Sequence, residues 1–257
     1  MRHEVTVVCL ALVLGALVGA LACSKNTATQ PQPTMSTLWG RVTEGGFGLA
    51  QATVEVTASW GRNSTTTDSS GNYSGLKASG DVTLRAEKEG FSAQVKQLTV
   101  DQNQVVNFDL QRVETPGDPQ GVYTLIITAS PSCTALPAEA RQRNYWARID
   151  RTQNDLQVTL REGNFLDFGW GWGSVPETKF AGTRDGSTVR FTIGEEQVVE
   201  VLPSETLLSY AGTATGAIND WTIAAAFDGT VRVSTTDYNL TLLAECQAKD
   251  HRLEFVR

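Results

Sequence analysis

Residues 180–193, FAGTRDGSTVRFTI, carry the clearest folding signal in the chain. Two runs of alternating apolar and polar residues, one ending at Thr183 and one beginning at Val189, flank the pair Asp185-Gly186. An Asp-Gly pair between alternating runs is a strong signal for a β-hairpin, because both residues tolerate the positive φ of a tight turn. The segment therefore predicts two antiparallel strands.

The same pattern extends outward over residues 121–257. Alternating runs occur at residues 123–129, 145–149 and 156–160. Further turn signals are Asn154-Asp155, Asn219-Asp220 and Asp228-Gly229. Together these signals predict about eight consecutive antiparallel strands. Such a meander closes into a barrel with a lipocalin-like layout, or alternatively folds as a sandwich.

Four cysteines constrain this domain further. Cys9 and Cys23 belong to an apolar leader, which leaves Cys133 and Cys246. In an oxidising compartment, two remaining cysteines favour a disulfide. Cys133 follows the first predicted strand and Cys246 precedes the last, so a bridge would bring the first and last strands together, as barrel closure requires. A reactive or metal-binding pair, the alternative, lacks further ligands because His251 is the single histidine beyond the leader.

The leader predicts the compartment. Residues 5–22 are apolar or small except for Thr6, and they follow a short start that contains Arg2. This pattern is typical of a signal peptide. The run ends at Ala22-Cys23-Ser24 and resembles the signal of bacterial lipoproteins, which implies a lipid on Cys23 and, with Ser24 in place of aspartate, placement in the outer membrane. Alternatively, the run stays as an uncleaved anchor. Either interpretation places the remaining chain outside the cytoplasm.

The composition predicts five segments. We expect a signal peptide at residues 1–22, a lipid-anchored tether at 23–36, a first domain at 37–112, a linker at 113–120 and a second domain at 121–257. The tether and the linker are rich in proline and polar residues and show no apolar periodicity. Such segments do not build a packed core.

The first domain also consists of short alternating strands between turns, so the whole chain is predicted to be all-β. Its pattern includes Gly40-Arg41-Val42, GLAQATV at 48–54, TDSSGNY at 67–73, Gly80 and Gly90-Phe91. In these residues the domain resembles the carboxypeptidase regulatory-like, or transthyretin-like, family. The resemblance implies a seven-stranded prealbumin-like β-sandwich of the carbohydrate-binding-like superfamily, and it implies no enzyme activity. Within the pattern, Asp68 is expected to serve the turn and Tyr73 to be buried.

One aromatic stretch, NFLDFGWGWG at residues 164–173, is the predicted binding site. Phe168, Trp170 and Trp172 share one parity, so an extended strand would present all three rings on one face. Stacked rings suit a glycan or a small apolar ligand, and Asp167 and Glu177 would add polar contacts. Alternatively, the rings pack into the barrel or cap its mouth, or they contact lipid near the anchor.

Several function classes are disfavoured. The formal net charge of −7 argues against nucleic-acid binding. The sequence has no Gly-x-Ser-x-Gly elbow, no zinc-ligand spacing and no phosphate-binding loop, so we expect no catalytic residue, metal or cofactor. Four arginines between residues 141 and 151 could bind an anion, although pairing with neighbouring acids is the simpler interpretation.

These observations favour a non-catalytic cell-envelope lipoprotein that binds a glycan, a small ligand or a surface partner. The first domain would be a spacer or adhesion-type module, and the second a barrel that binds through its aromatic loop. One alternative is a hydrolase of envelope or extracellular glycans that uses paired carboxylates such as Asp167 and Glu177. Another is a purely structural surface protein. The sequence does not indicate an oligomeric state.

Overall fold

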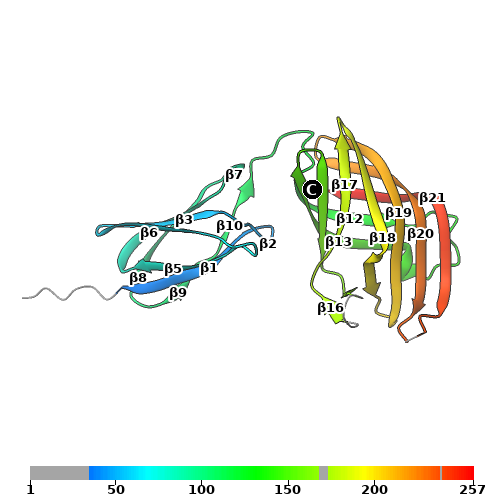
Figure 1. The fold of residues 1–257 in the computed structure, drawn as a ribbon, viewed down its shortest axis with the longest axis horizontal. Coiled ribbons are helices and arrows are strands. Elements are labelled where there is room, and N and C mark those ends of the chain that lie inside the picture. Colours follow the sequence, from blue (N-terminus) through cyan, green and yellow to red (C-terminus); the bar gives the residue numbers. More distant parts are fainter. Residues whose placement is uncertain (1–34, 168–172, 238) are drawn as a thin grey trace, which may run out of the picture. The chain divides into compact units, whose positions relative to one another are not determined.

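The computed structural model describes residues 35–167, 173–237 and 239–257. The prediction of an all-β chain is confirmed: strands fill both domains, and the short helix α1 (Ala138–Arg141) interrupts them once in the described residues (Figure 1). Over the same residues, no helix has the length and apolarity needed to span a membrane.

The first domain is a sandwich of two sheets that enclose one apolar core. One sheet contains β1 (Ser36–Glu44), β2 (Phe47–Gly48), β5 (Asn72–Ala78), β9 (Gln104–Val105) and β10 (Phe108–Asp109). The other has the order β4 (Gly61–Thr66), β3 (Thr53–Ala58), β6 (Gly80–Glu87), β8 (Gln94–Val100). A small pair joins β7 (Phe91–Ser92) to β11 (Gln111–Arg112). Leu38, Val56, Leu76 and Leu84 are buried between the two sheets.

The strand next to β1 is split into two short pieces, β9 and β10. β9 and β10 both run parallel to β1, and a register shift lies in β1 between Leu38 and Gly40. Gly40 approaches Val106 so closely that an added Cβ would lie 2.1 Å from the Val106 carbonyl oxygen. This close approach interrupts the regular ladder and divides one strand into two short ones.

The turn before β5 has the predicted structure. Asp68 Oδ1 accepts hydrogen bonds from the amides of Ser70 and Asn72, each at 2.9 Å. Gly71 has a φ of +81°, which a residue with a Cβ adopts only with strain. Tyr73 is buried, and its hydroxyl donates to the Val106 carbonyl at 2.5 Å. Asp68 therefore serves the turn.

The second domain is a closed barrel, which decides between the two predicted architectures. Its eight strands are β12 (Gly121–Thr128), β13 (Gln142–Thr152), β14 (Asp155–Arg161), β17 (Thr178–Asp185), β18 (Thr188–Val201), β19 (Thr206–Asn219), β20 (Thr222–Thr235) and β21 (Leu242–Val256). Each strand pairs with the next in this order, and β12 pairs with β21 to complete the ring. A short hairpin, β15 (Phe165–Asp167) and β16 (Gly173–Val175), is attached to β18.

The predicted disulfide is present between Cys133 and Cys246, whose Cα atoms are 5.5 Å apart. Cys133 lies in the connection between β12 and β13. Cys246 lies inside β21 rather than ahead of it, because this strand begins at Leu242. The bridge therefore joins the β12–β13 connection to β21, and the pairing of β12 with β21 is the one that closes the barrel.

Three of the four predicted turns link strands, and the fourth does not. Asn154-Asp155, Asp185-Gly186 and Asn219-Asp220 lie at hairpin turns. The expectation of a turn at Asp228-Gly229 is wrong, because both residues lie inside β20. Gly229 pairs with Gly212, where an added Cβ would lie 2.5 Å from the Gly229 Cα. Here glycine permits close strand contact and a register shift against β21, not a chain reversal.

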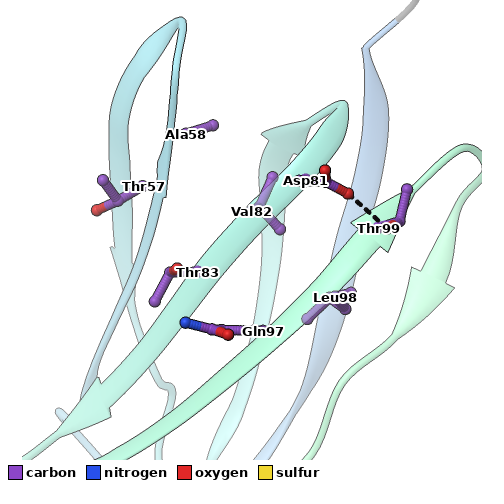
Figure 2. Close-up of a pocket in the computed structure, with 8 residues that line it drawn as sticks. All are labelled: Thr57, Ala58, Asp81, Val82, Thr83, Gln97, Leu98 and Thr99. Atoms are coloured by element: carbon purple, nitrogen blue, oxygen red, sulfur yellow. Dashed lines mark hydrogen bonds between the residues drawn. The ribbon is translucent and has the colours of Figure 1, made fainter.

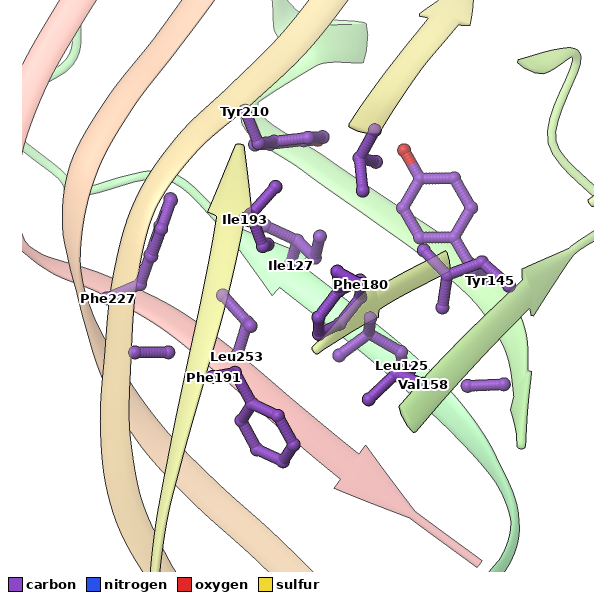
Figure 3. Packing of buried hydrophobic residues seen from close by; sticks show 14 of the residues in the cluster. Leu125, Ile127, Tyr145, Val158, Phe180, Phe191, Ile193, Tyr210, Phe227 and Leu253 are labelled. Atoms are coloured by element: carbon purple, nitrogen blue, oxygen red, sulfur yellow. The ribbon is translucent and has the colours of Figure 1, made fainter. Parts of the chain in front are cut away.

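Side chains fill the interior of the barrel (Figure 3). Phe191 contacts Phe255 with ring centroids 5.2 Å apart, and it meets Phe180 edge-on at 6.0 Å. Tyr145, Tyr210 and the three phenylalanines are all at most 2% exposed. An eight-stranded barrel is narrow enough for side chains to fill its interior. The described residues of the barrel therefore form one packed apolar core.

The hairpin between β1 and β2 contacts side chains of β13 and β14. Trp146 donates its indole N–H to the Gly45 carbonyl at 2.7 Å, and Arg161 donates to the Gly46 carbonyl at 2.8 Å. The Arg161 guanidinium lies 4.4 Å from the centroid of the Phe47 ring, and Phe47 is 1% exposed. These contacts explain why the hairpin tip, although rich in glycine, carries a buried aromatic ring.

Candidate functional site

The predicted aromatic site lies mostly outside the described residues. Phe168, Trp170 and Trp172 are not among them, so their role stays a prediction. Asp167 is exposed at the end of β15, where it pairs with Gly173 of β16. The predicted ligand contacts of Asp167 and Glu177 likewise stay a prediction.

Glu177 is part of an ion-pair group. Arg161 donates two hydrogen bonds to Glu177 Oε2, at 3.1 and 2.8 Å, and Lys179 lies 3.5 Å from Oε1. Partial burial acts to raise the pKa of Glu177, but the bonds and charge of Arg161, together with Lys179, outweigh it and lower the pKa. A glycosidase acid needs a raised pKa. Glu177 is thus unsuited to protonate a leaving group.

The arginines at residues 141–151 bind groups of the protein itself. Arg141 donates to the carbonyls of Leu136 and Thr134. The other three contact carboxylates, through the pairs Arg143–Glu200, Arg148–Asp150 and Arg151–Asp118. This agrees with the interpretation that they pair with neighbouring acids. They do not form an open anion site.

His251 is fully buried and bound to backbone through both ring nitrogens. The Ser130 amide donates to Nδ1 at 2.9 Å, and Nε2 faces the Gly229 carbonyl at 3.2 Å. Burial lowers the pKa of His251, although the Gly229 carbonyl, Asp250 and Asp228 act in the opposite direction. The ring therefore links the β12–β13 connection to β20 through backbone groups, which is a structural role.

Sequence reasoning missed a buried charge in the barrel. Glu200 of β18 is 2% exposed, and both of its oxygens accept hydrogen bonds from Arg143, one of them at 3.0 Å. The Tyr145 hydroxyl donates to the same carboxylate at 2.8 Å. The available signal was a glutamate inside the run Val198-Val199-Glu200-Val201, where a strand buries its neighbours.

The Glu200 cluster is closed rather than reactive. Burial raises the pKa of Tyr145, and the neighbouring Tyr210 and Glu200 raise it further. Burial also raises the pKa of Tyr210. Both phenols therefore remain protonated near neutral pH, and Glu200 receives three donors from within the protein. Donors from within the protein thus occupy most of the acceptor sites of this buried carboxylate.

An open hollow lies on the outer face of the sheet β3–β6–β8 in the sandwich (Figure 2). We call it the sheet-face hollow; its volume is about 560 Å³. Thr57, Thr83 and Gln97 form one row across it, because Thr57 pairs with Thr83 and Thr83 with Gln97. In the next row, the Thr99 hydroxyl donates to Asp81 at 2.6 Å. Two cross-strand rows of polar groups thus face solvent.

The row has unused hydrogen-bonding capacity. Within residues 35–167, 173–237 and 239–257, the side chains of Thr83 and Gln97 form no hydrogen bond, and Thr57 bonds only to Glu55, at 3.2 Å. A hydroxyl and a carboxamide both donate and accept. No lysine or arginine lines the hollow. Over the described chain, no group of three or more histidine, cysteine or acidic side chains is arranged to hold a metal.

The hollow could have been suspected from strand parity. In β6 the residues Val82, Leu84 and Ala86 are buried, so Asp81, Thr83 and Arg85 must face outward. The sequence does not show, however, that Thr57 and Gln97 lie on either side of Thr83. That arrangement depends on the registers of two strand pairs separated along the chain.

Residues 37–111 match the family model of the carboxypeptidase regulatory-like domain. This confirms the resemblance inferred for the first domain. The match does not extend into the barrel. No curated protein matches the chain.

Comparison with solved structures gives only distant similarity. A candidate carbohydrate-binding protein from Bacteroides uniformis ATCC 8492 is 9% identical, covers 85% of this chain and 95% of its own, and has a TM-score of 0.28. The Bacillus anthracis TIE protein is 12% identical, with coverages of 84% and 47% and a TM-score of 0.27. A candidate membrane-associated protein of unknown function from Bacteroides fragilis NCTC 9343 is 12% identical, with coverages of 88% and 99% and a TM-score of 0.24. Similarity at this level supports no inference about the ligand.

Proposed function

We propose that the chain is a non-catalytic binding protein of the bacterial cell envelope and that the sheet-face hollow binds a neutral glycan. The observation that supports it is the row Thr57–Thr83–Gln97, in which outward-facing polar groups are held at strand spacing. Thr83 and Gln97 have no side-chain hydrogen bond within the described protein, and Thr57 bonds only to Glu55. Neighbouring strands lie ~4.8 Å apart, close to the width of a sugar ring. Adjacent hydroxyls of a glycan could therefore meet adjacent strands.

The charge of the hollow favours a neutral ligand. Asp81 is its one charged lining residue, and the chain as a whole is acidic. Anionic ligands such as phosphates would meet repulsion and no cation. A sugar hydroxyl, in contrast, can donate to Asp81 and to the Gln97 carbonyl oxygen and accept from the Gln97 amide.

The envelope location rests on the leader. We propose that Cys23 carries lipid, because it ends the apolar run 5–22 and precedes a polar tether. In this arrangement the sandwich presents the hollow, and the packed barrel serves as a stable body that carries the aromatic segment. This reverses our first expectation, which assigned spacing to the sandwich and binding to the barrel.

A pair of substitutions tests the hollow. Thr83→Val with Gln97→Leu removes two hydrogen-bonding groups while keeping side chains of similar size. Each lost bond is worth about 1 kcal/mol, so we expect affinity for the bound glycan to fall roughly tenfold or more. A neutral-glycan array identifies the ligand with the wild-type chain, and calorimetry then compares wild type and variant.

Thr53→Val is the matched control. Thr53 lies on the same face of β3 as Thr57 but pairs with Thr66 and Glu87, outside the hollow. The control should bind like wild type, and all variants should keep the wild-type melting temperature. Full binding by the double variant, or a wild-type chain that captures no neutral glycan, would reject the hollow as the site.

A further inference from the structure

The sandwich has an exposed apolar patch at the start of its first strand. Met35, Trp39 and Val105 are 41%, 40% and 55% exposed, and Trp39 of β1 pairs with Val105 of β9. We call these three residues the β1 patch. A tryptophan exposed to this degree loses much of the burial energy that its ring could provide, so folding does not explain its position.

The surroundings of Trp39 leave its ring accessible. Between the pairs Leu38–Leu76 and Gly40–Tyr73, the neighbouring strand β5 contributes Ser74 and Gly75. Gly75 has a φ of +83°, and an added Cβ there would meet no atom within 4 Å. In the described part of the chain, the Trp39 indole N–H forms no hydrogen bond. The ring therefore offers both an apolar face and a free donor.

A lysine on the same sheet face lies near the β1 patch. Lys77 pairs with Thr37 in the sheet, and its ammonium group donates to the Thr37 hydroxyl at 2.6 Å. No carboxylate of the described residues lies within 4 Å of this ammonium group. In a chain with a net charge of −7, such a cation is available to an anionic group outside the protein.

The position of the patch along the chain indicates what would cover it. The first described residue, Met35, belongs to the patch and directly precedes β1, which contains Trp39. Twelve residue steps separate Cys23 from Met35, a maximum of about 40 Å of extended chain. If Cys23 carries lipid, the β1 patch is the described surface that is nearest to the bilayer along the polypeptide.

We propose that the β1 patch rests on the headgroup region of a phospholipid bilayer, with Trp39 at the interface and Lys77 against lipid phosphate. The proposal rests on the lipid anchor of the proposed function. Tryptophan favours the membrane interface because its ring is apolar and its N–H is polar. The apolar contact is small, so binding depends on the high local concentration of lipid that the anchor provides.

Quenching by brominated lipid tests this surface. The full-length lipidated protein is reconstituted into vesicles of phosphatidylcholine and phosphatidylglycerol, with or without brominated acyl chains. We expect the wild type to be quenched and Trp39→Phe to lose about half of that quenching or more, because interfacial tryptophan lies beside the upper acyl chains. Lys77→Glu should weaken the quenching as well, since it places a negative charge against phosphate.

Trp221→Phe is the matched control, because Trp221 is 39% exposed but belongs to the barrel. It should retain the wild-type quenching. Mass spectrometry of the same preparation reports whether Cys23 carries lipid. A lipidated protein whose quenching is unchanged by Trp39→Phe would overturn the β1 patch and leave the anchor intact. An unlipidated Cys23 would overturn the anchor, and the surface that rests on it.

Discussion

The barrel and the sandwich are both built from β-strands, but they differ in how their polar side chains are bonded. In the barrel, the sheet closes on itself and every inward side chain enters one filled core. Among the described barrel residues, the buried carboxylate of Glu200 accepts hydrogen bonds from Arg143 and Tyr145. In the sandwich, the outer sheet face stays open, and Thr83 and Gln97 form no side-chain hydrogen bond in the described chain. Closing a sheet into a barrel therefore favours stability, whereas an open sheet face leaves polar side chains accessible from solvent.

This comparison also separates two kinds of unusual residue. His251 and Glu200 look functional by residue type, yet the structure satisfies both from within the protein. Thr83 and Gln97 look ordinary by type, yet their side chains have no partner in the described chain. The proposed site is therefore marked by unused hydrogen-bonding capacity at a concave surface rather than by residue type.

Removing the disulfide should give the largest difference between the domains. The bridge spans 113 residues, and the chain-entropy model assigns such a loop about 4–5 kcal/mol. Cys133→Ser with Cys246→Ser should destabilise the barrel by about that amount. Hydrogen exchange measures it, with faster exchange in β20 and β21 and unchanged protection in β3 and β6. Equal loss of protection in the barrel and in the sandwich would contradict the expectation that the disulfide stabilises the barrel alone.

Breaking the buried ion pair should have the next largest effect. Arg143→Met leaves Glu200 buried without its cation, which should cost about 3 kcal/mol of unfolding free energy in urea. Adding Glu200→Leu should restore most of the loss, because the unpaired charge is removed.

Arg232→Met is the comparison variant for the ion pair. Arg232 bonds to Glu245 on the surface, where both side chains are about 40% exposed. Its loss should cost less than about 1 kcal/mol. If Arg143→Met proved no more destabilising than Arg232→Met, the distinction between the filled interior and the surface would fail.

The smallest expected effect is a pH dependence from His251. Burial holds its pKa below the value of 6.5 for a free side chain, so the folded protein favours the neutral ring. The stability that this provides is complete above pH ~6.5 and is lost as the pH falls toward the folded pKa, because the unfolded chain binds the extra proton. Thermal melting between pH 7.5 and 5 measures the change.

His251→Asn keeps a group able to accept from the Ser130 amide and removes the titration. This variant should be less stable than wild type but should lose less stability over the same pH range. An identical pH profile in both proteins would assign the dependence to other groups.

Part of the fold could be predicted because its signals are local. The turns at Asp185-Gly186 and Asn219-Asp220 follow from the conformations those residues tolerate, and the Asp68–Gly71 turn follows in the same way. The disulfide followed from the two cysteines left beyond the leader, and it favoured barrel closure without excluding a sandwich. The prediction of a turn at Asp228-Gly229 failed, because glycine permits close contact between strands as readily as it permits a turn.

The sequence by itself determined the all-β class, the order of most strands, the disulfide and the family of the first domain, because alternation, turn chemistry and cysteine count are properties of short segments. Only the tertiary structure decided that the barrel is filled, that Glu200 is enclosed by Arg143 and Tyr145, and that Thr57, Thr83 and Gln97 form one row. These features depend on which strands become neighbours and in which register. The sequence of one strand does not specify which strand pairs with it or in which register. The row of polar side chains therefore forms only when the sheets assemble.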